Sequence, residues 1–413
     1  MTTGGSDARV LTGDWLVRAA GHGEWRTVAE RGLDESEWQA TSTPGRWWLD
    51  AGLADESAVL YRRRFELPAE GTAELGSPDG TADRDARWWF VANGLCELGH
   101  LWLDGTYLGD LRGRHAEHAF EVSHLLRASP EHLAAVEASH GAVRVPQSED
   151  AQVQIEQTGP ARIQRVRALV IEASPDRAVL RIAATVDSSG THRSEITTTV
   201  LPAEDPEAGW SQDASRQVAS EGDGLALSEP VLARGRNELE WLVALEQPSL
   251  WWPAGLGDQA LYCIDIDVAV DGRSSHAVRL PTGIRTVSLR RGRVAVNGEP
   301  LRGGLDALRV VQHELSHRCA YDSANTRGEL LCQQVTLEPS VFTGAERGLR
   351  ALAAQAAAAA ADHAGHHPCI AAWQPVHPSD GRRRAPRIGS WTDRTVRQAM
   401  HAADPTRPAL PTR

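Results

Sequence analysis

Short stretches of alternating polar and apolar residues fill the first part of the chain. Residues 61–67 and 119–123 alternate at the period of a β-strand, in which successive side chains point to opposite faces of a sheet. In residues 101–109, Asp104-Gly105 separates two apolar runs, and this pair favours a two-residue hairpin turn. Many short strands separated by turns are typical of a sandwich or a jelly roll. We therefore predict an all-β first domain, residues 1–158.

The strand pattern continues in a second region, residues 159–285. Residues 165–171 and 178–186 bracket a Ser-Pro-Asp turn, and residues 237–245 and 261–270 supply two further strands. About seven short strands in a segment of this length are typical of an immunoglobulin-like sandwich. We predict such a sandwich here.

The pattern changes in the third region, residues 286–413. An Ala-rich helical segment, residues 347–363, is followed by the short apolar run 369–373 and then by a polar loop broken by prolines. A short apolar run of this kind is typical of a buried parallel strand. Helix, buried strand and loop form the repeating unit of an α/β barrel, in which the carboxyl ends of the strands carry the chemistry. We therefore predict a partial (β/α) TIM-type barrel.

Further elements are predicted in the same region. Residues 308–313 form a short buried strand, and residues 319–331 and 391–403 have helical character. The last residues, 404–413, carry three prolines and are expected to fray. The region has about half of the ~250 residues of a full barrel. We expect a remnant that folds differently or a homo-oligomer in which another chain completes the barrel.

Composition and charge exclude several classes of function. The net charge of −12 argues against a nucleic-acid partner, which would require a basic face. No apolar run approaches the ~20 residues of a membrane span, and residues 1–10 lack the pattern of a signal peptide. We therefore expect a cytoplasmic protein without a membrane partner.

Cysteine and histidine spacing predicts neither a metal site nor a disulfide framework. The five cysteines are scattered and contain no CxxC pair. His363, His366 and His367 are metal-ligand candidates, but a polar helix end explains them as well, and zinc requires a defined fourth ligand. No cofactor is predicted.

Ordered motifs in all three regions resemble glycoside hydrolase family 2, which contains β-galactosidases, β-glucuronidases and β-mannosidases. LWLDGTYLG (residues 101–109) resembles the sugar-binding jelly roll of this family. LWWPAGLGDQALY (residues 250–262) is similar to the end of its immunoglobulin-like domain and points to the β-mannosidase side. HHPCIAAW (residues 366–373) resembles the barrel strand that presents the acid/base. The resemblance implies hydrolysis of a terminal β-glycosidic bond with retention, without a cofactor, on a carbohydrate substrate.

The catalytic loop departs from the family pattern. A retaining glycosidase needs two carboxyl groups ~5 Å apart. The resemblance places the acid/base at position 378, where this chain has a proline, which cannot transfer a proton. Asp380 is the nearest carboxylate and our candidate for a displaced acid/base; the nucleophile region of the family has no counterpart. The alternatives are a catalytically inactive homologue that binds carbohydrate or a partner protein, and a truncated product.

Five residues are candidates for substrate binding by the same resemblance. Arg309, His313 and Glu314 follow the first barrel-like strand, where the family binds sugar hydroxyls. A solvated loop is the alternative for His313 and Glu314, and an ion pair with an internal carboxylate is the alternative for Arg309. Trp373 is expected either to stack on a sugar or to lie in the core. His377 lies beside Pro378 in the same loop.

Overall fold

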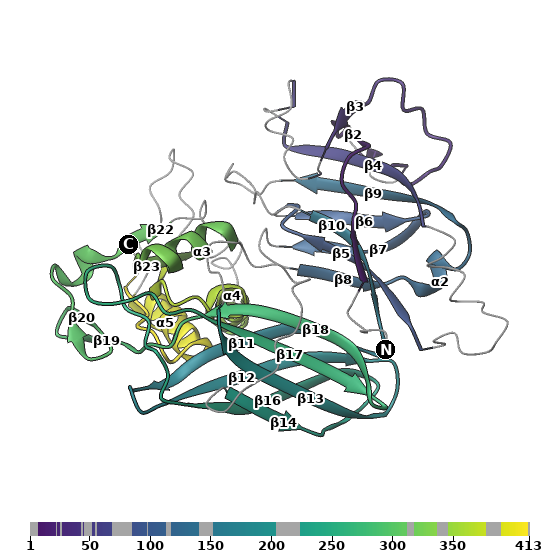
Figure 1. Cartoon of the computed structure of the whole chain (residues 1–413). Coiled ribbons are helices and arrows are strands. Elements are labelled where there is room, and N and C mark those ends of the chain that lie inside the picture. The colour runs from purple at the N-terminus through teal and green to yellow at the C-terminus, as the bar shows by residue number, and fades with distance from the viewer. Residues whose placement is uncertain are drawn as a thin grey trace. The chain divides into compact units, whose positions relative to one another are not determined.

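A computed structural model describes residues 7–21, 23–24, 27–42, 44, 52–53, 56–67, 85–96, 98–112, 117–139, 152–203, 224–311, 318–336, 346–376 and 390–411. This part of the chain is mainly β and contains several separate sheets (Figure 1). The contacts divide the chain into two compact units, Met1–Pro160 and Ala161–Arg413.

The first unit contains two antiparallel sheets. The smaller has the order β1 (Asp7–Val10), β10 (Gln152–Thr158), β5 (Arg87–Asn93) and β8 (Glu117–Glu121). The larger has the order β3 (Gln39–Thr41), β2 (Trp15–Ala19), β4 (Ala58–Glu66), β9 (Glu131–Ser139), β6 (Leu98–Leu103) and β7 (Thr106–Arg112). A short helix, α2 (Ser123–Leu126), follows β8.

The core of the first unit lies between these sheets. It contains fully buried side chains from both sheets, among them Trp15, Tyr61 and Phe90. The predicted hairpin is confirmed: β6 and β7 meet at Asp104 and Gly105, whose φ angles of 51° and 81° are left-handed, as a tight turn between twisted strands requires.

The second unit begins with another pair of sheets. One has the order β11 (Ala161–Ala173), β12 (Arg177–Ser188) and β16 (Gly235–Glu246). The other has the order β14 (Gly224–Ser228), β13 (His192–Pro202), β17 (Tyr262–Val270) and β18 (Arg273–Thr282), with β15 (Val231–Leu232) also paired to β13. Their facing side chains form one core, which contains Leu180, Ile182 and Ile264.

A small α/β part follows in the same unit. It begins with three antiparallel strands, β19 (Val287–Arg290), β20 (Arg293–Val296) and β21 (Glu299–Pro300), and the turn η4 (Gly304–Ala307). A parallel sheet follows, in which each strand precedes a helix. The order is β22 (Arg309–Val311), α3 (Arg318–Arg327), β23 (Leu331–Thr336), α4 (Glu346–Ala364), β24 (Ile370–Val376) and α5 (Ser390–Ala403). The predictions of a helix over 347–363, a buried strand from 369 and a helix over 391–403 are confirmed. The described residues contain no closed barrel.

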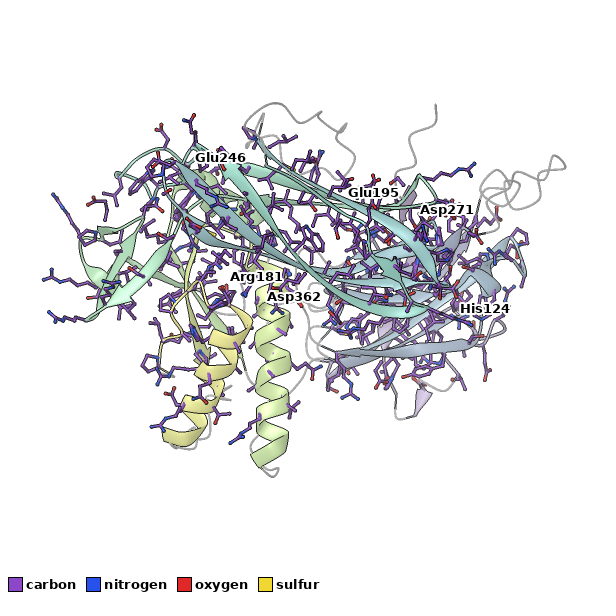
Figure 2. All side chains as sticks on the ribbon, turned by 90° about the horizontal axis from the view of Figure 1, so that it is seen from below. His124, Arg181, Glu195, Glu246, Asp271 and Asp362 are labelled. Atoms are coloured by element: carbon purple, nitrogen blue, oxygen red, sulfur yellow. The ribbon has the colours of Figure 1, made fainter. Side chains whose placement is uncertain are left out.

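Helix α4 is fixed to the sandwich by an ion pair. Arg167 on β11 lies 2.6 Å from the Asp362 carboxylate, and it also donates a hydrogen bond of 3.2 Å to the Ala403 carbonyl at the end of α5. Figure 2 shows Asp362 near the end of α4 that meets the sheet. The sandwich and the α/β part therefore share contacts on both helices.

The prediction that the last residues fray is wrong for residues 404–411. The amide of Trp373 donates to the Pro408 carbonyl at 3.0 Å, and the amide of Leu410 donates to the Trp373 carbonyl at 2.7 Å. These bonds form a parallel bridge between Trp373 and Ala409. The prolines do not prevent docking, because Pro408 contributes a carbonyl acceptor and needs no N–H. The segment covers part of the outer edge of β24.

Candidate functional site

The three parallel strands define one functional edge. β22, β23 and β24 run in the same direction as neighbours, so their carboxyl ends face the same edge of the sheet; Thr336 pairs with Val376 there, and Val311 ends β22 three residues earlier, opposite Gln333. In α/β folds this carboxyl edge is where ligands bind, because the loops that leave the strands converge there.

Four of the six predicted site residues lie outside the described residues. His313 and Glu314 follow β22, and His377 and Asp380 follow β24, as does Pro378. The strand order therefore places the starting points of their segments at one edge. The predicted roles of these four residues stay predictions.

Arg309 lies at the opposite end of its strand. It is the first residue of β22, and its half-exposed guanidinium forms an ion pair with Glu329, which also contacts Arg327 at 3.2 Å. This arrangement matches the ion-pair alternative for Arg309. A sugar at the carboxyl edge would lie beyond Val311.

Trp373 is part of the core. Its side chain is 0% exposed, and its indole N–H donates to Oδ2 of Asp404 at 2.8 Å. A sugar ring cannot stack on this indole unless the packing opens, so the arrangement favours the core alternative.

The turn that precedes β24 is held by a buried arginine, Arg407. Its Nε donates to the Ile370 carbonyl at 2.7 Å, and its Nη2 donates to the carbonyls of Gly365 at 2.7 Å and His367 at 3.1 Å. Its Nη1 lies 2.7 Å from Oδ2 of Asp404. The planar guanidinium thus links helix α4, the turn and β24.

Other donors complete the hydrogen bonding of this turn. Nε of Arg285 donates to the Pro368 carbonyl at 2.9 Å, and the Thr282 hydroxyl donates to the His366 carbonyl at 3.0 Å. The amide of Leu331 donates to the Cys369 carbonyl at 2.8 Å. Every carbonyl from residue 365 to residue 370 therefore accepts a hydrogen bond, which is what a buried turn requires.

The charges in this cluster are two arginines and one carboxylate. Burial lowers the pKa of Arg285 well below its usual range, and the neighbouring Arg407 lowers it further. Burial alone would raise the pKa of Asp404, but Arg407 and the hydrogen bonds from Thr406 and Trp373 outweigh it and hold this pKa below its usual value. The carboxylate is therefore ionised and has a structural role beneath the site.

The histidines of the turn are buried among polar partners. Oδ1 of Asn325 accepts the Cys369 amide at 3.2 Å, so its amide nitrogen faces Nδ1 of His367, 2.9 Å away, and Nδ1 acts as the acceptor. The His366 ring lies 4.2 Å from the His367 ring, measured between centroids. No group of metal-ligating side chains occurs within the residues that the structure describes. Burial raises the pKa of the Cys369 thiol, which therefore stays protonated.

Sequence reasoning missed strand β23 and the edge it supplies. Gln334 on β23 donates to Gln374 on β24 at 3.2 Å, and Gln333 accepts a bond of 2.7 Å from the Tyr321 hydroxyl. A signal was present, because Gly328, with a φ of 65°, marks the end of helix α3. Since β23 was missed, Glu338, which follows it in the sequence, was not considered.

Comparison with known sequences identifies a family over the sandwich of the second unit. Residues 161–285 match the family described as glycosyl hydrolases family 2. An exo-β-D-glucosaminidase of Amycolatopsis orientalis is 43% identical over 70 residues, which cover 15% of this chain and 7% of that protein. A β-mannosidase B of Emericella nidulans is 33% identical over 66 residues, which cover 16% and 8%. The matched part is thus less than a tenth of each relative's length.

Comparison with solved structures shows the same fold over nearly the whole chain. A putative β-galactosidase from Bacteroides fragilis has a TM-score of 0.71 at 15% identity and covers 98% of this chain and 63% of its own. The exo-chitosanase of Amycolatopsis orientalis has a TM-score of 0.68 at 16% identity, with coverages of 98% and 52%. Among the described residues, no helix is long and apolar enough to cross a membrane.

Proposed function

Because this chain belongs to glycoside hydrolase family 2, we propose that it is a glycosidase of carbohydrate metabolism that hydrolyses terminal β-glycosidic bonds with retention. β-Mannosides are the favoured substrates, since several relatives are β-mannosidases and residues 250–262 carry a motif from that side of the family. We assign the two-sheet part of the first unit as a jelly roll and residues 161–285 as an immunoglobulin-like sandwich. The parallel strands are assigned as part of a TIM-type barrel. A cytoplasmic location and a homo-oligomer are part of the same proposal.

The observation that supports hydrolysis is the shared carboxyl edge of three parallel strands. In the sequence, each strand is followed by a segment that contains one carboxylate: Glu314 after β22, Glu338 after β23 and Asp380 after β24. Neighbouring strands lie ~4.8 Å apart. Segments that leave neighbouring strands at one edge therefore begin close together, as two carboxyl groups ~5 Å apart require.

The reaction needs one acid and one nucleophile. Asp380 would protonate the leaving glycosidic oxygen while a second carboxylate attacks the anomeric carbon and forms a glycosyl ester. Glu338 is the favoured nucleophile, because its segment follows the strand next to that of Asp380. Asp380 would then take a proton from water, which cleaves the ester and releases the sugar.

Residues 250–262, the motif at the end of the sandwich, contact the α/β part. Trp251 is fully buried, and its indole N–H donates to the Asn325 carbonyl near the end of α3 at 2.9 Å. The carbonyl of Trp251 accepts a bond of 3.0 Å from Asn297, which lies between β20 and β21. These contacts fix the parallel sheet against the sandwich, so the motif is suited to a positioning role.

The test is turnover of p-nitrophenyl β-glycosides (mannoside, galactoside, glucuronide and glucoside). We expect the mannoside to be hydrolysed best, and Asp380→Asn and Glu338→Gln each to lower kcat/KM at least ~100-fold, as the loss of a general acid does. Asp271→Asn is the matched control, because Asp271 lies at an exposed turn with a φ of 51° that asparagine also adopts.

One observation favours a second function, an inactive carbohydrate-binding or partner-binding homologue. Proline stands at position 378, where the family presents its acid, and Trp373, five residues earlier in the sequence, is closed in the core. Absence of turnover on all four glycosides by folded protein would select this alternative. Turnover that is unaffected by Asp380→Asn would keep the hydrolase proposal and remove Asp380 as its acid.

A further inference from the structure

The most exposed hydrophobic side chains of the described residues gather on two short strands of the second unit. Val231, Leu225 and Leu227 are 64%, 59% and 58% exposed, more than any other large hydrophobic side chain in this part of the chain. Leu225 and Leu227 lie on β14, and Val231 lies on β15, which pairs with the same neighbour, β13. Exposed apolar side chains that gather in one place mark an interaction surface.

Both leucines of β14 point away from the core of the sandwich. Ala226, which lies between them, packs against that core, so the alternation of a β-strand sends Leu225 and Leu227 to the outer face. Their neighbours on β13 are Thr199 and Thr197. The outer face of this sheet therefore ends in two leucines on its last strand.

The free side of β14 is an edge at which a further strand can pair. β14 is the last strand of its sheet: it pairs with β13, and no described strand pairs with its other side. Gly224 holds it against the opposite sheet, because a Cβ at this position would lie only 3.0 Å from Leu245 and 3.1 Å from Val243 of β16. The edge is thus ordered before any partner arrives, which lowers the cost of binding.

The other edge strands of the sandwich carry charges, whereas β14 does not. These charges include Arg165 and Arg167 on β11, Arg236, Glu238 and Glu240 on β16, and Arg273 and Arg279 on β18. Strand β14 reads Gly-Leu-Ala-Leu-Ser and contains neither a charge nor a proline. Charges and prolines on an edge strand oppose pairing with another chain, so β14 is the edge of this sandwich that permits it.

The sequence of β14 is complementary to itself. When two copies of Gly224–Ser228 pair in antiparallel fashion about Ala226, Leu225 of each copy lies opposite Leu227 of the other, on the same face of the sheet. Side chains that are directly opposite have Cβ atoms ~4.5–5.5 Å apart, so the leucines touch. Both halves of this contact are identical, as a two-fold axis requires.

We propose that β14 pairs with β14 of a second copy of this chain, about a two-fold axis at Ala226. The sheets of the two copies join edge to edge, and their four leucines cover one another. A second copy fits better than an unrelated strand, because the register that places leucine on leucine is the symmetric one. The absence of charge on β14 matters here, since each copy has a net charge of −12. The paired segment has five residues, so the dimer is small and transient.

This contact goes beyond the proposed function. The homo-oligomer predicted from the sequence completes a barrel at the parallel sheet, whereas β14 belongs to the antiparallel sandwich. Neither leucine of β14 has a part in the proposed hydrolysis. The dimer is therefore measured independently of turnover, and failure of one proposal is distinguishable from failure of the other.

The test is sedimentation velocity of the full chain between ~1 µM and ~1 mM, the range in which transient complexes dissociate. We expect a monomer–dimer equilibrium. Leu225→Lys and Leu227→Glu should each weaken it at least ~tenfold, because by symmetry each change replaces both leucine pairs. The double variant Leu225→Lys/Leu227→Glu places an ammonium opposite a carboxylate twice and should restore the dimer to within ~threefold of wild type.

Two controls isolate the register. Leu225→Lys/Leu227→Lys makes the same number of substitutions without complementary charges, so it should stay as weak as the single variants. Leu242→Lys changes a leucine of similar exposure, 57%, on β16 and should leave the dimer intact. A wild-type chain that stays monomeric over the whole range would overturn the proposal. So would a dimer that neither single variant weakens, or a Lys/Glu double variant no stronger than the Lys/Lys one.

Discussion

Replacement of Arg407 by methionine tests whether the buried cluster holds strand β24 in place. Methionine keeps much of the apolar stem and removes the guanidinium. The carbonyls of Gly365 and His367 then lose their arginine donor, while the Ile370 carbonyl keeps a bond from Arg285. Asp404 keeps its bond from Trp373 and loses its ion-pair partner.

The expected cost follows from these partners. Removal of one member of a buried ion pair costs ~3–5 kcal/mol, and each buried acceptor without a donor costs ~1–3 kcal/mol. These two costs overlap, because the same Arg407 guanidinium is both the ion-pair partner of Asp404 and the donor to the carbonyls. Arg285 offsets part of the loss, since it is no longer repelled by Arg407. We therefore expect the variant to lose about 3–5 kcal/mol of unfolding free energy, a large share of the ~5–15 kcal/mol of a typical domain.

Hydrogen exchange as a function of urea concentration measures this loss of unfolding free energy at strand β24, where we expect it. Peptides from β24 should exchange at least ~100-fold faster in the variant, because ~3 kcal/mol corresponds to more than two factors of ten. Peptides from β9 in the first unit provide an internal reference. Arg397→Met is the control, because among the described residues Arg397 forms a surface pair of 2.9 Å with Asp393 on the same helix. If Arg407→Met changed β24 no more than Arg397→Met, the structural role of the cluster would be refuted.

Three further predictions concern the same structures. Trp373→Phe removes only the indole N–H bond to Asp404 and some ring volume, so we expect a loss of ~1.5–3 kcal/mol by urea unfolding. The pKa of Asp404 is lowered in the folded chain, so the ionised carboxylate stabilises the fold fully above the unfolded pKa of about 3.9. This stabilisation is lost as the pH falls through the lower folded pKa. In wild-type protein the urea midpoint should therefore fall below about pH 4, and Asp404→Asn should make this fall smaller. Asp104→Ala removes the acceptor of His132 Nδ1 at 2.7 Å and of the Leu133 amide at 2.9 Å, and β6–β7 amides should exchange faster, with β17 unchanged.

Local patterns predicted the elements whose cause is local. Helix α4 follows from an Ala-rich segment, strand β24 follows from a short apolar run, and the β6–β7 turn follows from the left-handed preference of Asp104-Gly105. Strand β23 was missed because Gln333 and Gln334 interrupt its apolar run. These glutamines are stable inside the sheet because partners on other elements bond their side chains, such as Gln374 on β24.

Contacts between distant segments explain the other differences. Arg407 bonds carbonyls that lie 37 to 42 residues earlier, and nothing in the sequence near Arg407 marks those acceptors. The docking of residues 404–411 also depends on contacts with distant segments. The prolines of this segment predicted fraying, because the sequence does not show that β24 provides an edge for it to bond. The two alternatives for Trp373 were equal in sequence because the choice depends on Asp404, which lies 31 residues later, directly after helix α5.

The packing around Trp373 constrains how a catalytic edge can work in this chain. Asp404 accepts bonds from both Trp373 and Arg407, and the main chain of Trp373 is bonded to residues 408–410. A shift of β24 would break these bonds together, so the strand is held as a fixed base from which the Asp380 segment leaves. A change that compensates for the proline at position 378 must therefore lie after Val376 and not within the strand. This is why Asp380→Asn and Arg407→Met should differ, the first affecting turnover without stability and the second affecting stability first.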